Sequence, residues 1–286
     1  MSVSGKPVTA AELAPAGAAG RVPVTPRARP VAGVTRLLVV PVGLVAAWQL
    51  ATLAVTNPAF VSPGETMVEL RRGLSDPRVL RSIGDTVEAA GVAFVLAGAA
   101  GMLAGSVLGL RRYWFEAVTP LLYGLNSIPK ITLYPVFLLV FGLGLDSRVA
   151  FGTFHGLFVM SLIMAEAVQT LPPGYRKLMR TYRLGTLRAV RHVIAPALLP
   201  FVMTGLRLTF ALTLTGVVIA ELFSATSGIG HELMRDVSLA RTDRIVALVA
   251  IVIGIALVPT SLLRIVERRV TQRYGSGSAG GRGRGW

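Results

Sequence analysis

Six long apolar stretches, separated by short charged or polar segments, are the feature that most constrains how this chain folds. They span roughly residues 37–55, 86–110, 116–143, 149–170, 197–222 and 245–264. A helix needs about 20 mostly apolar residues to cross the hydrocarbon core of a bilayer. With 53% hydrophobic and 15% charged residues and a mean hydropathy of +0.65, the sequence predicts an all-α polytopic membrane protein with six transmembrane helices.

The third stretch differs from the others because it contains two prolines, Pro129 and Pro135. A proline removes a backbone hydrogen-bond donor and clashes with the preceding turn of a helix. We therefore expect this span to be broken or kinked near Ser127 to Lys130.

Positive charge is concentrated on one side of the predicted topology. The formal net charge of +15 would suggest nucleic-acid binding in a soluble protein, but here the charges lie between apolar runs, so no nucleic-acid partner is expected. With the N-terminus inside, the inner segments carry 19 Lys and Arg residues and four acidic residues, whereas the outer segments carry eight of each. Since positive loops stay in the cytoplasm, a multi-pass protein of the cytoplasmic membrane with both termini cytoplasmic is predicted.

The apolar runs also divide the chain into regions. Residues 1–33 are expected to form a flexible cytoplasmic tail, residues 34–270 the transmembrane domain, and residues 271–286 a disordered basic tail. The chain has no Cys and only three widely spaced His residues, so neither a disulfide nor a metal site is predicted. It also lacks a Walker motif for binding phosphate, so no bound cofactor is expected.

The second stretch carries a glycine at every fourth residue, at Gly101, Gly105 and Gly109. Glycines at this spacing form a groove in which another helix can approach closely. We favour packing within the chain, and an interface with a second subunit is the alternative.

Charged residues at membrane depth are costly and each needs an explanation. For Lys130 we favour a cap on the broken helix that bonds freed carbonyl groups, for Arg207 a side chain that reaches the cytoplasmic surface, and for Glu221 one that reaches the outer interface. The alternative for all three, together with Pro129, is the lining of a translocation path. No acid–base pair or activated nucleophile is recognisable, which favours a transport subunit over an enzyme.

Two outer connections contain recognisable local signals. VSPGETMVELRRGL after the first stretch predicts a turn and an amphipathic helix with Glu65 in its first turn. SATSGIGHELMRD after the fifth stretch predicts a short surface helix or a docking surface for an external partner.

Four stretches resemble the permease subunit of bacterial ABC importers, in the branch that serves nitrate, sulfonates and taurine. They are VSPGETMVEL, DTVEAAGVAFVLAGAAGMLAGSVLGL, LNSIPKITLYPVFLLVFGLGLDSRVA and VIAPALLPFVMTGLRL. The resemblance covers about 200 residues, and the order of the spans agrees with it. It implies six transmembrane helices of the importer permease type, with a cytoplasmic coupling loop at residues 171–195.

The coupling loop departs from the family motif, which has Glu-Ala-Ala, three further residues and then Gly. Aligning Pro196 without gaps puts Lys177, Leu178 and Met179 at the Glu-Ala-Ala positions and Arg183 at the Gly position. Aligning Gly185 instead puts Met179-Arg180-Thr181 there and leaves the loop two residues short. The acidic residue is missing in both alignments.

The resemblance implies that this loop docks on a separate ATP-hydrolysing subunit, which would bind ATP and magnesium. The residues expected to make this contact are Leu178, Tyr182, Arg183, Leu184, Gly185, Thr186, Leu187 and Arg188. The arginines alone could instead reflect topology and contact with anionic headgroups of the lipid bilayer.

The predicted function is therefore that of a permease subunit that moves a small, anionic or organic solute by alternating access. The implied partners are an ATP-binding subunit, an extracytoplasmic substrate-binding protein and a second permease subunit, identical or related. The alternative is a stand-alone secondary transporter or channel, which would be expected to show paired intramembrane carboxylates or an inverted repeat.

Overall fold

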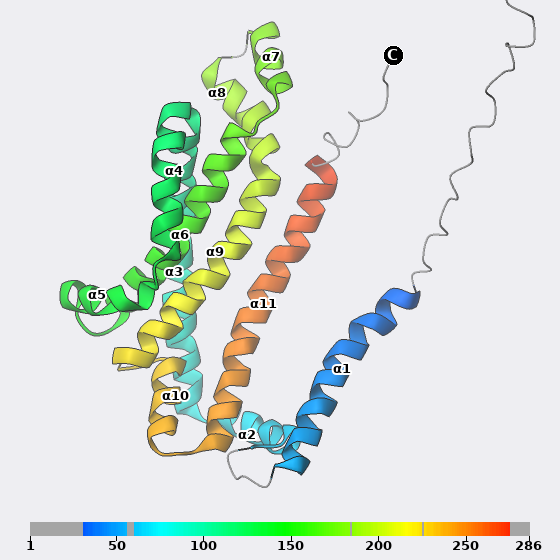
Figure 1. Cartoon of the computed structure of the whole chain (residues 1–286), viewed down its shortest axis with the longest axis vertical. Helices are drawn as coiled ribbons and strands as arrows, with labels where there is room; N and C mark the ends of the chain where they lie inside the picture. The colour runs from blue at the N-terminus through cyan, green and yellow to red at the C-terminus, as the bar shows by residue number, and fades with distance from the viewer. Residues whose placement is uncertain (1–30, 56–59, 184, 225, 275–286) are drawn as a thin grey trace, which may run out of the picture. The chain divides into compact units, whose positions relative to one another are not determined.

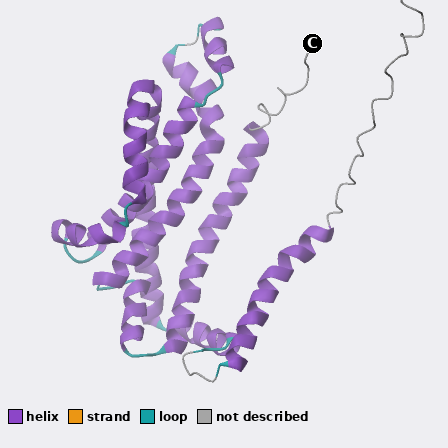
Figure 2. Ribbon diagram, in the orientation of Figure 1, coloured by secondary structure: helices purple, strands orange, loops and turns teal. Residues whose placement is uncertain are grey.

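The computed structural model describes residues 31–55, 60–183, 185–224 and 226–274. The chain divides into two units, residues 1–50 and residues 51–286. Throughout the described residues the regular structure is helical and no strand occurs, and Figure 2 shows the helices joined by short loops. The all-α fold predicted from the apolar runs is confirmed.

α1 (Val31–Ala54) lies mostly in the first unit. The helices that follow lie in the second unit. They are α2 (Pro63–Ser75), α3 (Pro77–Leu110), α4 (Arg112–Ser127), the 3-10 turn η1 (Lys130–Leu133), α5 (Tyr134–Phe141), α6 (Leu145–Gln169), α7 (Pro173–Thr181), α8 (Thr186–Ala189), the π-helical turn η2 (Val190–Ile194), α9 (Ala195–Ser224), α10 (Ile229–Ser238) and α11 (Thr242–Tyr274).

Among the described residues, four helical segments are long and apolar enough to cross a membrane. They are α3, α6, the segment Val190–Phe223 formed by η2 and α9, and α11. The predicted third span consists of α4 and the η1–α5 pair, bent by 87° at the break between Ser127 and Lys130. The predicted break is therefore confirmed, and the two parts count as a fifth span if they cross together. The apolar part of α1, Val39–Ala54, is short for a helix that crosses alone, so the count of six is not reached on length and composition.

The second unit is built around α3, α6 and α9, with α11 packed along α9 (Figure 1). Between α3 and α9, alanines such as Ala89 and Ala93 pack against Phe210 and Val217. Between α6 and α9, Met160 and Met164 fill the corresponding space. Small residues on one helix and large ones on its neighbour let these helices pack closely.

The glycine groove of α3 faces α6 of the same chain. A Cβ atom at Gly105 would lie 2.2 Å from the Ser161 carbonyl oxygen, and one at Gly109 would lie 2.7 Å from Val168 Cβ. At Gly101 it would lie 2.6 Å from Met160 Cβ. Since real side chains do not approach so closely, the distance between α3 and α6 requires glycine at these positions.

The bundle has two distinct ends. α7 and α8 lie at one end, and α2 and α10 lie at the other, which we call the α7 end and the α2 end (Figure 1). At the α2 end, Ser62 and Glu65 form the capping box of α2 and Asp76 caps α3. The amphipathic helix predicted after Val61 and the short helix predicted after Ser227 are both present.

Candidate functional site

The first candidate site is the α7–α8 segment, residues 173–194, at the α7 end of the bundle (Figure 1). α7 begins at Pro173, where the missing N–H of proline needs no partner. Leu178 of α7 is 43% exposed, and Tyr182, which follows the end of α7, is 69% exposed. Exposed apolar side chains on a short helix that also carries basic residues suit contact with another protein.

The remaining predicted contact residues follow α7. Gly185 accepts a hydrogen bond from the backbone of Ala189 at 2.9 Å, and the Arg188 side chain is exposed. Leu184 lies outside the described residues, and the side chains of Thr186 and Leu187 are likewise not described. The segment then runs through η2 directly into α9.

Arg183 has an unusual backbone conformation, with a φ of 47°. Arg183 lies two residues beyond the end of α7, and its N–H donates to the Arg180 carbonyl at 3.1 Å. This is the left-handed region, which favours glycine and in which other residues are uncommon. The gap-free alignment places Arg183 where the importer motif has Gly, and the backbone of this chain has a glycine-like conformation at that position.

The second candidate site is a buried polar cluster formed by Glu221, Thr86 and Arg148. Glu221 lies near the end of α9 and is only 1% exposed. The Thr86 hydroxyl from α3 lies 2.9 Å from both carboxylate oxygens, and Arg148 Nη1 from α6 lies 3.3 Å from Oε1. The expectation that Glu221 reaches the outer interface is therefore wrong, because α10 folds back over it.

The same cluster fixes the start of α10. The Gly230 N–H donates to Glu221 Oε2 at 3.1 Å, and the Ile229 N–H donates to the Thr86 hydroxyl at 2.9 Å. Gly228 has a φ of 102°, and a Cβ there would lie 2.2 Å from Glu221 Oε1. Arg148 also donates to the Gly144 and Ser227 carbonyls at 3.1 and 3.4 Å. A buried carboxylate with these donors therefore links four helices at the α2 end.

A second acidic residue is buried in α10. Asp236 is 2% exposed, and its Oδ1 lies 3.9 Å from Arg241 Nη1 and 4.0 Å from Arg244 Nη1. Arg244 also lies 3.4 Å from Asp76, the cap of α3. These ion pairs join α10, α11 and the start of α3.

Lys130 lies at the break of the bent span, as predicted, but its partner differs from the expected one. Its Nζ donates to the Asn126 side-chain oxygen at 2.7 Å and lies 5.7 Å from the centre of the Phe158 ring. The ammonium group therefore bridges the break through a side chain of α4, not through a freed carbonyl group. Pro129, which precedes η1, lies in the same break.

Two threonines of α9 form an unusual polar feature inside the bundle. Thr209 and Thr213 are fully buried, and among the described residues their hydroxyl oxygens have no hydrogen-bond partner. A Cβ at Gly156 of α6 would lie 2.3 Å from the Thr213 hydroxyl oxygen. The α6–α9 contact therefore places two small polar groups at the centre of the bundle.

Arg207, which was expected to reach the cytoplasmic surface, is paired with a carboxylate of α11. Its Nε donates to Glu267 Oε2 of α11 at 2.8 Å, and the Thr204 hydroxyl donates to Glu267 Oε1 at 2.6 Å. This pairing was not predicted from the sequence; α11 supplies the carboxylate at the same level of the bundle.

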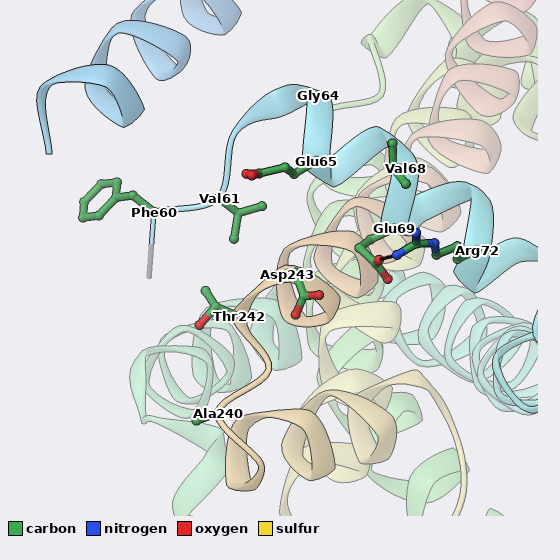
Figure 3. Close-up of a pocket in the computed structure, with 10 residues that line it drawn as sticks. All are labelled: Phe60, Val61, Gly64, Glu65, Val68, Glu69, Arg72, Ala240, Thr242 and Asp243. Carbon is green, nitrogen blue, oxygen red and sulfur yellow. Dashed lines mark hydrogen bonds and ion pairs between the residues drawn. The ribbon is translucent and has the colours of Figure 1, made fainter. Parts of the chain in front are cut away.

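A cavity of about 790 Å³ opens at the α2 end, between α2 and the connection from α10 to α11 (Figure 3). Its walls include Phe60, Val68 and Asp243, and Glu69 of the same wall is paired with Arg72. The Ser62 N–H and hydroxyl bond to Glu65 at 2.8 and 2.9 Å and hold the pKa of this carboxyl below its ordinary value. The walls thus combine apolar surface with carboxylates.

The sequence alone did not indicate that Arg148 and Thr86 belong to a buried cluster. Arg148 follows a short connection, where a charge is expected from the topology. A signal was nevertheless present, since Arg148 and Glu221 lie next to predicted outer span ends, where opposite charges can pair.

The family model described as "binding-protein-dependent transport system inner membrane component" matches residues 97–272. This range extends from α3 to α11 and includes the α7–α8 segment and the buried polar cluster except Thr86.

Curated relatives agree with this match. A putative aliphatic sulfonates transport permease of Bacillus subtilis is 23% identical over 82% of this chain and 85% of its own length. The taurine transport system permease of Escherichia coli is 25% identical over 80% and 85%. A nitrate import permease of Synechococcus elongatus is 25% identical over 49% and 50%.

Among solved structures, the MetNI methionine ABC transporter in an inward-facing conformation has a chain with the same fold. The TM-score is 0.57 at 18% identity, over 68% of this chain and 95% of that one.

Proposed function

This chain belongs to the family of binding-protein-dependent transport system inner membrane components, and we propose that its α7–α8 segment couples it to an ATP-hydrolysing partner. It is a permease subunit of an ABC importer and not an enzyme. It is a multi-pass membrane protein that works with an ATP-binding subunit and a substrate-binding protein. ATP and magnesium would be bound by the partner.

The observation that carries the coupling proposal is the uncovered apolar surface of α7. Leu178 and Tyr182 lie one turn apart on the end of the bundle, and Arg180 and Arg188 are exposed on the same segment. A cleft in the partner would bury the two apolar side chains, while acidic groups at its rim would meet the arginines. Because the segment continues through η2 into α9, movement of the docked segment would be passed directly to a central helix.

Copurification with the ATPase of the same importer tests this coupling. Replacing Leu178 and Tyr182 by serine should reduce the recovered ATPase about tenfold or more, since two buried anchors are lost. Tyr113 and Leu110, which are 75% and 70% exposed outside the α7–α8 segment, provide the matched control when replaced by serine. Equal recovery of the ATPase with both double variants would refute the docking surface, provided that both variants elute from size-exclusion chromatography as the parent protein does.

For the substrate, we propose a small anion of the sulfonate or nitrate type. The support is the function of the relatives, which are permeases for aliphatic sulfonates, nitrate and taurine. Uptake of labelled nitrate, taurine and an alkanesulfonate, compared between a deletion strain and one with the whole operon restored, tests the class. Restored uptake of an uncharged solute alone would contradict it.

We further propose alternating access between outward and inward openings, in a dimer with a second copy or a related permease. The closely packed α3, α6 and α9 would move as one body, with the break at Pro129 and Lys130 beside the path. The substrate-binding protein would dock at the α2 end, where α2, α10 and the cavity of Figure 3 lie together. In this proposal the α7 end and both termini face the cytoplasm.

A further inference from the structure

We propose that the cavity between the C-terminal part of α11 and Arg207 of α9 binds the phosphate group of an anionic phospholipid. The cavity measures about 560 Å³ and lies at the α7 end of the bundle. It is lined by Arg207, Arg264, Glu267, Arg268, Thr271 and Gln272. Nothing in the coupling or transport of solute requires this site, so the inference goes beyond the proposed function.

The charge of the cavity suits an anion. Glu267 is its single carboxylate and is already bonded to Arg207 and Thr204. Arg264 and Arg268 are exposed one turn apart, and neither forms an ion pair within the part of the chain that the structure describes. The lining thus keeps a formal net charge of +2, with two guanidinium groups available for phosphate oxygens and Thr271 and Gln272 as further donors.

The depth of the cavity suits a lipid headgroup. α11 has no charged residue from Ile245 to Leu263. A helix of that length is about 28 Å long, close to the thickness of the hydrocarbon core, which is about 30 Å. Arg264 is the first charge after this stretch and therefore lies where the core meets the headgroups.

The surface next to the cavity suits an acyl chain. Ile253 and Leu257 lie three and two turns before Arg264 on the same face of α11 and are 52% and 58% exposed. An anion held by Arg264 and Arg268 would thus be continuous with an uncovered apolar strip inside the bilayer. A soluble phosphate would make no use of that strip, which is why a phospholipid is the favoured ligand.

Lipid binding to the complete importer complex in a neutral detergent tests this proposal. Retained phosphatidylglycerol and phosphatidylcholine would be counted by native mass spectrometry, with inorganic phosphate as the soluble competitor. One arginine near an anionic lipid contributes a factor of about five to affinity, so Arg264→Gln/Arg268→Gln should weaken phosphatidylglycerol binding about 30-fold. Phosphatidylcholine retention should not change.

The matched control is Arg111→Gln/Arg269→Gln, which removes the same charge from exposed positions outside the cavity. It should change phosphatidylglycerol binding less than twofold. Arg264→Lys/Arg268→Lys keeps the charge and should retain most of the binding, which separates loss of the site from misfolding. The lipid site would be overturned if the site and control variants lost phosphatidylglycerol binding equally, or if the site variant bound as the parent does. Full competition by inorganic phosphate would also overturn it. So would a loss of lipid seen only in complexes that had lost the ATPase.

Discussion

At the scale of single residues, the buried pair of Glu221 and Arg148 is the most consequential feature. Either charge alone would be expensive at this depth, and together they hold Thr86 and the start of α10 in place. Removing one partner of such a buried pair costs more stability than the intact pair itself contributes, because it leaves the other charge buried and unpaired.

We therefore expect Arg148→Met to destabilise the protein by about 3–5 kcal/mol, because it leaves Glu221 buried without a cation. Adding Glu221→Gln to Arg148→Met should recover part of this loss, since the amide still accepts from Thr86 and Gly230 without carrying a charge. Melting curves in detergent measure both. As a control, Arg112→Met breaks an exposed pair with Glu116 and should cost no more than about 1 kcal/mol. Additive losses for Arg148 and Glu221 would show that the two are not coupled.

Arg183 provides a second prediction at this scale. Its φ of 47° strains any residue other than glycine, so Arg183→Gly should stabilise the end of α7 by about 1 kcal/mol. Slower amide hydrogen exchange in residues 177–183 would measure this effect. Arg180→Gly, inside α7, should have the opposite sign because glycine disfavours helix interiors. Faster amide hydrogen exchange in the Arg183→Gly variant would contradict the prediction that the backbone is strained at this position.

At the scale of elements, the packing of α3 against α6 depends on glycine. Gly105→Ala would place a methyl group 2.2 Å from a backbone oxygen of α6, so it should cost about 1–3 kcal/mol. Gly91→Ala lies in the same helix with nothing within 4 Å and should be neutral or stabilising by up to about 1 kcal/mol. Thermal melting of the two variants makes the comparison. Similar stabilities would mean that α3 and α6 are not in close contact.

The elements were largely predictable from the sequence, because apolar length and proline position are local properties. The break at Ser127–Lys130, the capped helix after Ser62 and the α7–α8 segment all follow from such signals. The surroundings of Glu221 were not predictable. Its partners lie 135 and 73 residues away in sequence, and its burial requires α10 to fold back over the end of α9. The partner of Arg207 was not predictable for the same reason, since Glu267 lies 60 residues away.

At the scale of the whole molecule, the proposed function depends on which end faces the cytoplasm. In the proposed orientation, which rests on the positive-inside distribution, the α7 end would face the cytoplasm and an ATPase, and the α2 end would face a binding protein outside. The chain contains no Cys, so single cysteines can report on each end without a background.

In cells that lack the ATPase, which would cover Tyr182 in the proposed complex, we expect a membrane-impermeant maleimide to label Ser238→Cys from outside and Tyr182→Cys only after the membrane is opened. Both positions are exposed, Ser238 at the end of α10 and Tyr182 at the end of α7. The unmodified chain, which cannot react, sets the zero level. Labelling of Tyr182→Cys from outside would place the α7–α8 segment away from any cytoplasmic ATPase. The coupling proposal would then fail while the fold and the buried cluster stood, because neither depends on the direction in which the bundle crosses the membrane.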